Sequence, residues 1–169
     1  MFRISHVLTA AAAAAVLMTA TQSYAQTRLT AEAAMAAARA VQAYAKNDGS
    51  DPSTVVVDAN GDIVLQLKGN NAAPHNIGLA ERKAFTANMF KMKSIDWRDA
   101  TMPGKDRAGE RQTPKAIPLG GGVPIMVGNE VVGAVGVSGT RGGQEGDTAG
   151  AQAGADAAAA LVQRPVAQN

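Results

Sequence analysis

The segment Thr-Val-Val-Val-Asp-Ala-Asn-Gly-Asp-Ile-Val-Leu-Gln-Leu, residues 54–67, decides the fold. It starts with a β-branched run, and it ends with an alternating one in which Ile63, Leu65 and Leu67 are separated by single residues. The dipeptide Asn60-Gly61 lies between the two runs, and Asn-Gly between apolar stretches is the strongest short-range signal for a β-hairpin. The segment therefore predicts two antiparallel strands.

The rest of the chain supplies helices and a second pair of strands. Helical periodicity follows Thr30, a plausible N-cap, and begins again at His75 or Asn76, with a short helical turn over 94–100 and an Ala-rich helix over about 147–162. Residues 123–127 and 130–138 read as strands, and the polar, Gly/Pro-containing stretch 101–115 reads as a long exposed loop. The order predicts an α+β fold with an antiparallel β-sheet flanked by α-helices.

Two glycines interrupt the last predicted strand. Gly133 and Gly136 weaken a strand, so their presence indicates a close approach by another backbone, a helix or a flat ligand.

The first 25 residues are typical of a secretory signal peptide. Arg3 is followed by an apolar stretch over 7–18, and the small residues Ser23 and Ala25 precede the expected cleavage site. We expect a signal peptide over 1–25, one domain over 26–164 and a C-terminal tail over 165–169. The mature protein is then periplasmic or secreted, with no stable membrane insertion after cleavage.

Composition excludes several classes of protein. The chain has no cysteine, which removes disulfides, thiolate catalysis and Fe–S clusters. The formal net charge is only +2, without a basic stripe, so nucleic acid is not an expected partner. Aromatic residues make up only 4%, so the core buries little apolar area per residue. Burial of an interface in a homo-oligomer would therefore stabilise the domain.

Two motifs resemble a known family. The sequence Ala-Glu-Arg-Lys-Ala-Phe-Thr-Ala at 80–87, and the glycine-punctuated sequences at 121–125 and 132–139, are similar to the GlcG/HbpS-like family of haem-binding or haem-degrading domains. The resemblance implies a compact sheet flanked by helices with profilin-like layering and assembly into a homo-oligomer. In several members it also implies haem binding, iron handling or oxidative haem breakdown. Residues 96–115 depart from the family pattern.

His75 is the candidate iron ligand. It is the one histidine that remains after signal removal, and a neutral imidazole is a common axial donor to haem iron. The alternative is a solvated residue at a helix start. Tyr44, Met89 and Met92 are fallback donors, which we otherwise expect in the core.

The other candidate cofactor-binding residues come from the two family motifs. Arg82 and Lys83 can pair with haem propionates, or they can lie on a solvated face, with Lys83 bonding carbonyls at a subunit contact. Phe85 belongs to the same motif. Gly121 and Gly122 either offer amide groups to an anion or form a permissive turn.

No catalytic residue can be assigned, because one histidine without partner spacing defines no triad and the acids form no convincing pair. Three functions stay open: an exported haem-binding protein that carries, scavenges or helps to sense haem; an oxidative haem-degrading enzyme; and a haem-free module for a small metabolite or a partner protein.

Overall fold

The computed structural model describes residues 28–162 of the 169-residue chain. In chain order the elements are α2 (Ala31–Lys46), β1 (Ser53–Asp58), β2 (Ile63–Leu67), α3 (Asn76–Phe90), α4 (Ser94–Ala100), the 3₁₀ helix η1 (Ala108–Gln112), β3 (Gly122–Val127), β4 (Glu130–Ser138) and α5 (Gly143–Val162). Across this part of the chain, no helix combines the length and the hydropathy that crossing a bilayer requires. The expected signal peptide and C-terminal tail lie outside the described residues.

The four strands form one sheet in the order β2-β1-β4-β3, and all neighbours are antiparallel. Both hairpins predicted from the sequence are present. Val56 faces Leu65 of β2 on one side and Val135 of β4 on the other, which places β1 in the interior of the sheet. The outer edges belong to β2 and β3. The α+β class expected from the order of the elements is confirmed.

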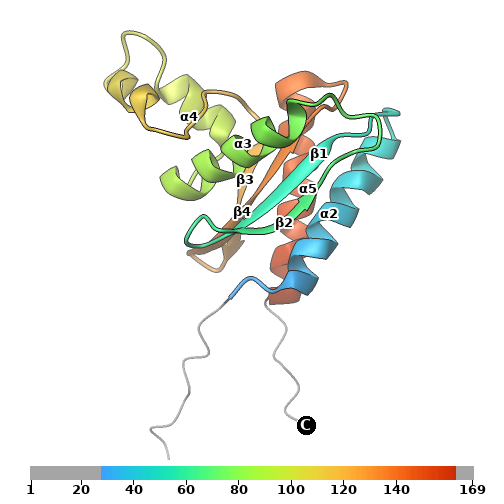
Figure 1. Cartoon of the computed structure of the whole chain (residues 1–169). Coiled ribbons are helices and arrows are strands. Elements are labelled where there is room, and N and C mark those ends of the chain that lie inside the picture. The colour runs from blue at the N-terminus through green and yellow to red at the C-terminus, as the bar shows by residue number, and fades with distance from the viewer. Residues whose placement is uncertain (1–27, 163–169) are drawn as a thin grey trace, which may run out of the picture.

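The helices cover the two faces unequally. In Figure 1, α3 (green) crosses in front of the sheet, whereas α2 (blue) and α5 (red) run behind it. The core behind the sheet includes Val41, Val56 and Val135, and a smaller core under α3 includes Val55 and Ala84. The alternation of β1 side chains thus sends successive valines into different cores.

Glycines allow α3 to approach the sheet closely. Gly122 of β3 faces Gly136 of β4 in the ladder. A Cβ atom on Gly136 would overlap the carbonyl of Ala80, and one on Gly122 would overlap the carbonyl of Lys83. The close approach that the strand glycines indicated is therefore made at Gly136 by a helix, and no flat ligand is needed to explain it.

Small residues also bring α2 and α5 together. A Cβ atom on Gly154 would lie 2.9 Å from Cγ2 of Val41, so the two helices meet where α5 has no side chain. The N-terminus of α2 is capped as expected, because Thr30 Oγ1 accepts the amide of Ala33 at 3.1 Å. The last helix is longer than the predicted range of about 147–162, because it starts at Gly143.

The segment 101–115 is more structured than a long exposed loop. It contains η1, and Arg107 binds both carboxylate oxygens of Glu110 at 2.8 Å. Glu110 also accepts the indole N–H of the fully buried Trp97 at 3.1 Å. Arg111 donates to the carbonyl of Thr101 at 2.6 Å. Arginine side chains, which the sequence reading treated as loop polarity, therefore hold this segment against α4.

Candidate functional site

The predicted iron ligand His75 lies at the N-terminal end of α3. Its side chain is exposed and makes no capping hydrogen bond. Of the fallback donors, Tyr44 packs towards Gly150 of α5. Met89 is 48% exposed, so the expectation that it belongs to the core is wrong. The sulfur of Met92 accepts a long hydrogen bond of 3.8 Å from Arg107.

Arg82 binds the segment that precedes β3 in the sequence. Its Nε donates to the carbonyl of Lys115 at 3.2 Å, and its Nη2 donates to that of Ala116 at 2.9 Å. Phe85, one turn further along α3, lies under the Lys115 ammonium at 5.7 Å from the ring centre. In this arrangement Arg82 and Phe85 hold the 115–116 segment on α3.

Lys83 lies in the interior, with 3% of its side chain exposed. Its Nζ donates to Oδ2 of Asp147 at 2.7 Å and to the carbonyl of Val137 at 3.1 Å. The aliphatic part passes Gly121, where a Cβ atom would lie 3.0 Å from its Cδ. The ammonium group is thus paired within the protein, and a propionate has no open path to it in this arrangement.

Asp147 completes this buried cluster from the first turns of α5. Its Oδ1 accepts the amides of Gly139 and Thr140 at 3.1 and 2.9 Å, and the Thr140 hydroxyl at 2.8 Å. The carboxylate therefore joins α3, the end of β4 and α5. A buried ion pair survives desolvation when its remaining hydrogen-bonding positions are filled in this way.

The glycine segment before β3 is likewise committed to internal contacts. The amide of Gly122 donates to Oγ of Ser94 at 2.8 Å, and the amide of Gly120 donates to Oε1 of Gln144 at 2.7 Å. Gly121 has a φ of +118°, a conformation that favours glycine. This geometry suits the permissive turn better than an anion site.

A different part of the molecule forms an apolar groove, between α2 and the edge strand β2. Its volume is about 450 Å³, within the range of small-molecule sites. None of the six residues proposed from the sequence lines it. We call it the α2–β2 groove, and its lining residues are Met35, Ala38, Arg39, Gln42, Ala43, Lys46, Leu65, Gln66 and Leu67.

The α2–β2 groove combines an exposed apolar surface with positive charge. Met35 is 42% exposed and Leu67 is 39% exposed, and both line the same groove; a contiguous apolar surface of this kind is a candidate binding site. Arg39 and Lys46 are the charged residues of the lining, and neither has an ion-pair partner within residues 28–162. They are seven residues apart on α2, about 10 Å along the helix axis.

A second hollow lies where the two hairpin turns meet. It has a volume of about 230 Å³ and is lined mainly by polar groups, among them Asp58, Asn60 and Glu130. Oδ1 of Asp58 is already bonded to the amides of Asn60 and Asp62, at 2.9 and 3.0 Å. Within the described residues, no three potential metal-binding side chains of His, Cys, Asp or Glu gather in one place.

Sequence reasoning missed the α2–β2 groove, although two signals pointed to it. Leu65 and Leu67 alternate towards one face of β2, and an edge strand leaves part of that face uncovered. Met35, Arg39 and Lys46 recur on α2 at helical spacing, outside the stripe of small residues that packs on the core. Identifying the groove required knowing that α2 lies beside β2.

The fold and the groove define a class, namely a small layered α+β domain with an exposed apolar groove beside its edge strand β2. A profile of the family described as "Haem degrading protein HbpS-like" matches residues 29–156. The chain belongs to this family, which confirms the resemblance seen in the two motifs.

Solved structures agree with this assignment. The ORFY protein of Klebsiella pneumoniae is 31% identical, with a TM-score of 0.73 over 78% of this chain and 91% of that protein. A double mutant of HbpS from Streptomyces reticuli is 31% identical, with a TM-score of 0.71 over 81% and 88%. A structure described as a PduOC:heme complex is 26% identical, with a TM-score of 0.70 over 77% and 94%. The family and this relative link the fold to haem.

Proposed function

We propose that this protein is an exported haem-binding protein that carries or scavenges haem, and that the α2–β2 groove is its binding site. The observation that carries the proposal is the pairing of an exposed apolar surface with two cations that have no ion-pair partner in the described chain. Haem is a flat apolar ring with two carboxylates, so it requires both features.

The lining residues fit this group. Ala43, Leu65 and Leu67 offer a surface for one face of the ring. Arg39 and Lys46 are exposed, so they can turn towards the propionates, and the guanidinium can bind a carboxylate in bidentate fashion. Bound haem supplies an iron centre that accepts axial ligands and changes oxidation state.

A hemin titration of residues 26–169 tests the site, with the Soret band as the signal. Reversing one charge of an exposed pair removes up to about 1 kcal/mol of attraction and adds a similar repulsion, so Arg39→Glu and Lys46→Glu should each weaken binding by up to roughly thirtyfold. Lys105→Glu makes the same change in charge on an exposed residue away from the groove and should leave the affinity unchanged. Added salt screens exposed charges, so the difference in hemin affinity between each groove variant and the unchanged protein should become smaller at higher ionic strength.

Two results would overturn this assignment. Absence of a saturable Soret band at micromolar protein removes haem binding as the function. If both charge reversals leave the hemin affinity unchanged but His75→Ala lowers it, the site lies at the start of α3 instead. We expect His75→Ala to bind hemin as the unchanged protein does, because His75 is exposed and does not line the groove.

Export is a separate part of the proposal, and its support is the sequence of residues 1–25. The full chain, expressed in a Gram-negative host, should reach the periplasm with a mature N-terminus at Gln26. Intact mass of the periplasmic protein measures this, and a cytoplasmic protein that retains Met1 would contradict it.

The second candidate function is oxidative haem breakdown, which membership of a family of haem-degrading proteins favours. In that case the haem-loaded protein, given a reductant and dioxygen, should lose its Soret band and release iron. Catalase must not prevent the loss, since peroxide alone bleaches haem. A Soret band that survives these conditions leaves carriage or scavenging.

A further inference from the structure

Iron in the α2–β2 groove has few possible protein ligands. The chain contains no cysteine, and His75 is the one histidine beyond residue 25. His75 does not line the groove. Of the lining residues, Lys46 carries an ammonium group at neutral pH, which has no lone pair to donate. Met35 carries a thioether, which is neutral and is a known axial ligand of haem iron.

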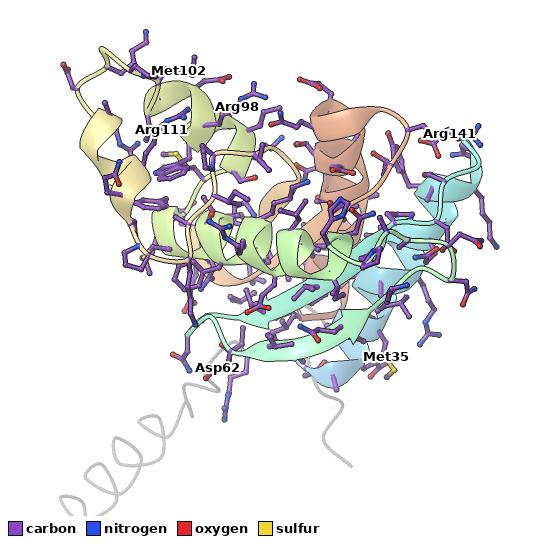
Figure 2. All side chains as sticks on the ribbon, turned by 45° about the horizontal axis from the view of Figure 1, so that its top comes forward. Met35, Asp62, Arg98, Met102, Arg111 and Arg141 are labelled. Atoms are coloured by element: carbon purple, nitrogen blue, oxygen red, sulfur yellow. The ribbon has the colours of Figure 1, made fainter. Side chains whose placement is uncertain are left out.

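Met35 is also placed and exposed as a ligand would be. It lies on α2 one turn before Arg39, so it shares the groove with a residue proposed to bind a propionate. Figure 2 shows its side chain at the margin of the molecule, beside the ribbons of α2 and β2. Its three flexible torsions let the sulfur swing over a ligand that lies on the groove floor.

The other methionines differ in their surroundings. The sulfur of Met92 is contacted by Arg107 at 3.8 Å, and that of Met102 by Arg111 at 3.3 Å. Met89 on α3 and Met126 on β3 are 48% and 40% exposed, but neither lines the groove. Met35 therefore combines an exposed side chain with a position at the apolar site, and Met89 provides a matched control.

We propose that the thioether of Met35 is an axial ligand of the iron when haem occupies the α2–β2 groove, an inference that rests on the proposed function. Thioether ligation raises the reduction potential of haem iron and so favours the ferrous state. A neutral sulfur on a flexible, exposed side chain is an exchangeable ligand, which suits a protein that hands haem on.

The test compares hemin-loaded mature protein with Met35→Leu, Met35→His and Met89→Leu. The measurements are the ferric and ferrous absorption spectra, magnetic circular dichroism and the midpoint potential. We expect Met35→Leu to lose the sulfur-to-iron charge-transfer absorption and to lower the potential. Met35→His should replace that signal with the spectrum of an imidazole-ligated haem, and Met89→Leu should match the unchanged protein.

The outcomes separate the two proposals. If the unchanged protein binds no hemin, the proposed function fails and this inference fails with it. If it binds hemin and Met35→Leu leaves the spectra and potential unchanged, the ligand assignment is wrong while the function stands. If Met35→Leu abolishes binding, restored binding with an imidazole spectrum in Met35→His supports ligation, and failure to restore it overturns ligation.

Discussion

Replacing Lys83 with methionine tests the buried cluster most directly. The change keeps an unbranched side chain of similar length beside Gly121 but removes the ammonium group. Asp147 loses its contact at 2.7 Å, and the carbonyl of Val137 loses a donor at 3.1 Å. Breaking a buried ion pair from one side costs about 3–5 kcal/mol. We expect a loss near 3 kcal/mol, since Asp147 keeps three other donors.

Removing the other partner should cost more. Asp147→Ala leaves the Lys83 ammonium buried with one carbonyl, and it also leaves the amides of Gly139 and Thr140 without their acceptor. The expected loss is above 4 kcal/mol, because each buried group left without a partner adds about 1–3 kcal/mol. The order of the two losses follows from the number of hydrogen bonds that each side chain makes.

Urea unfolding of a protein consisting of residues 26–169 measures both losses. The fluorescence of Trp97, the sole tryptophan of the chain and fully buried, reports the transition. Arg82→Met is the control, because it removes a neighbouring charge that is exposed, and it should cost about 1 kcal/mol. An unchanged midpoint in Lys83→Met, or a smaller loss in Asp147→Ala, would refute the reasoning. Folded Lys83→Met should still bind hemin, since Lys83 does not line the groove.

The remaining predictions concern packing and the segment around η1. Gly136→Ala should prevent stable folding, because its Cβ atom would overlap backbone of α3, whereas Gly109→Ala meets open space; thermal unfolding compares the two. Trp97→Phe should lose about 1 kcal/mol with its hydrogen bond to Glu110, as measured by urea unfolding followed by circular dichroism. Hydrogen bonds from Arg107 lower the pKa of the Glu110 carboxyl. Their stabilisation is therefore complete above the ordinary pKa of a glutamate in the unfolded chain, and it is lost as the pH falls from there through the lowered pKa of the folded state. Trp97 fluorescence in an acid titration should show this loss of stability. The same titration of Glu110→Gln should show a smaller loss, because glutamine has no carboxyl group to protonate.

The sequence predicted the fold well because its signals are local. The Asn60-Gly61 turn and the alternation after it specify a hairpin within a few residues, and the structure contains that hairpin. The start of the last helix was misplaced because Gly143 and Gly146 suggest a turn, while packing against Thr140 requires a residue without a side chain at Gly146. Tertiary contact overrides local propensity there.

The site was less predictable because its members are distant in sequence. Lys83 and Asp147 are 64 residues apart, and a lysine within a charged triplet gives no sign that it is buried. The groove depends on α2 lying beside β2, and neither Met35 nor Leu67 shows this separately. The haem expectation itself came from the family motifs, and the match to the HbpS-like family over residues 29–156, together with the similarity to the PduOC:heme complex, supports it at the level of the family.

The small residues between α2 and α5 also set the width of the opening on the far side of α2. Val41 rests against Gly154 on one flank of that helix, and Arg39 borders the groove on the other. A larger side chain at position 154 would push α2 away from α5 and so change the distance between α2 and β2. The size of the groove in this chain thus depends on an inner helix contact that does not line it.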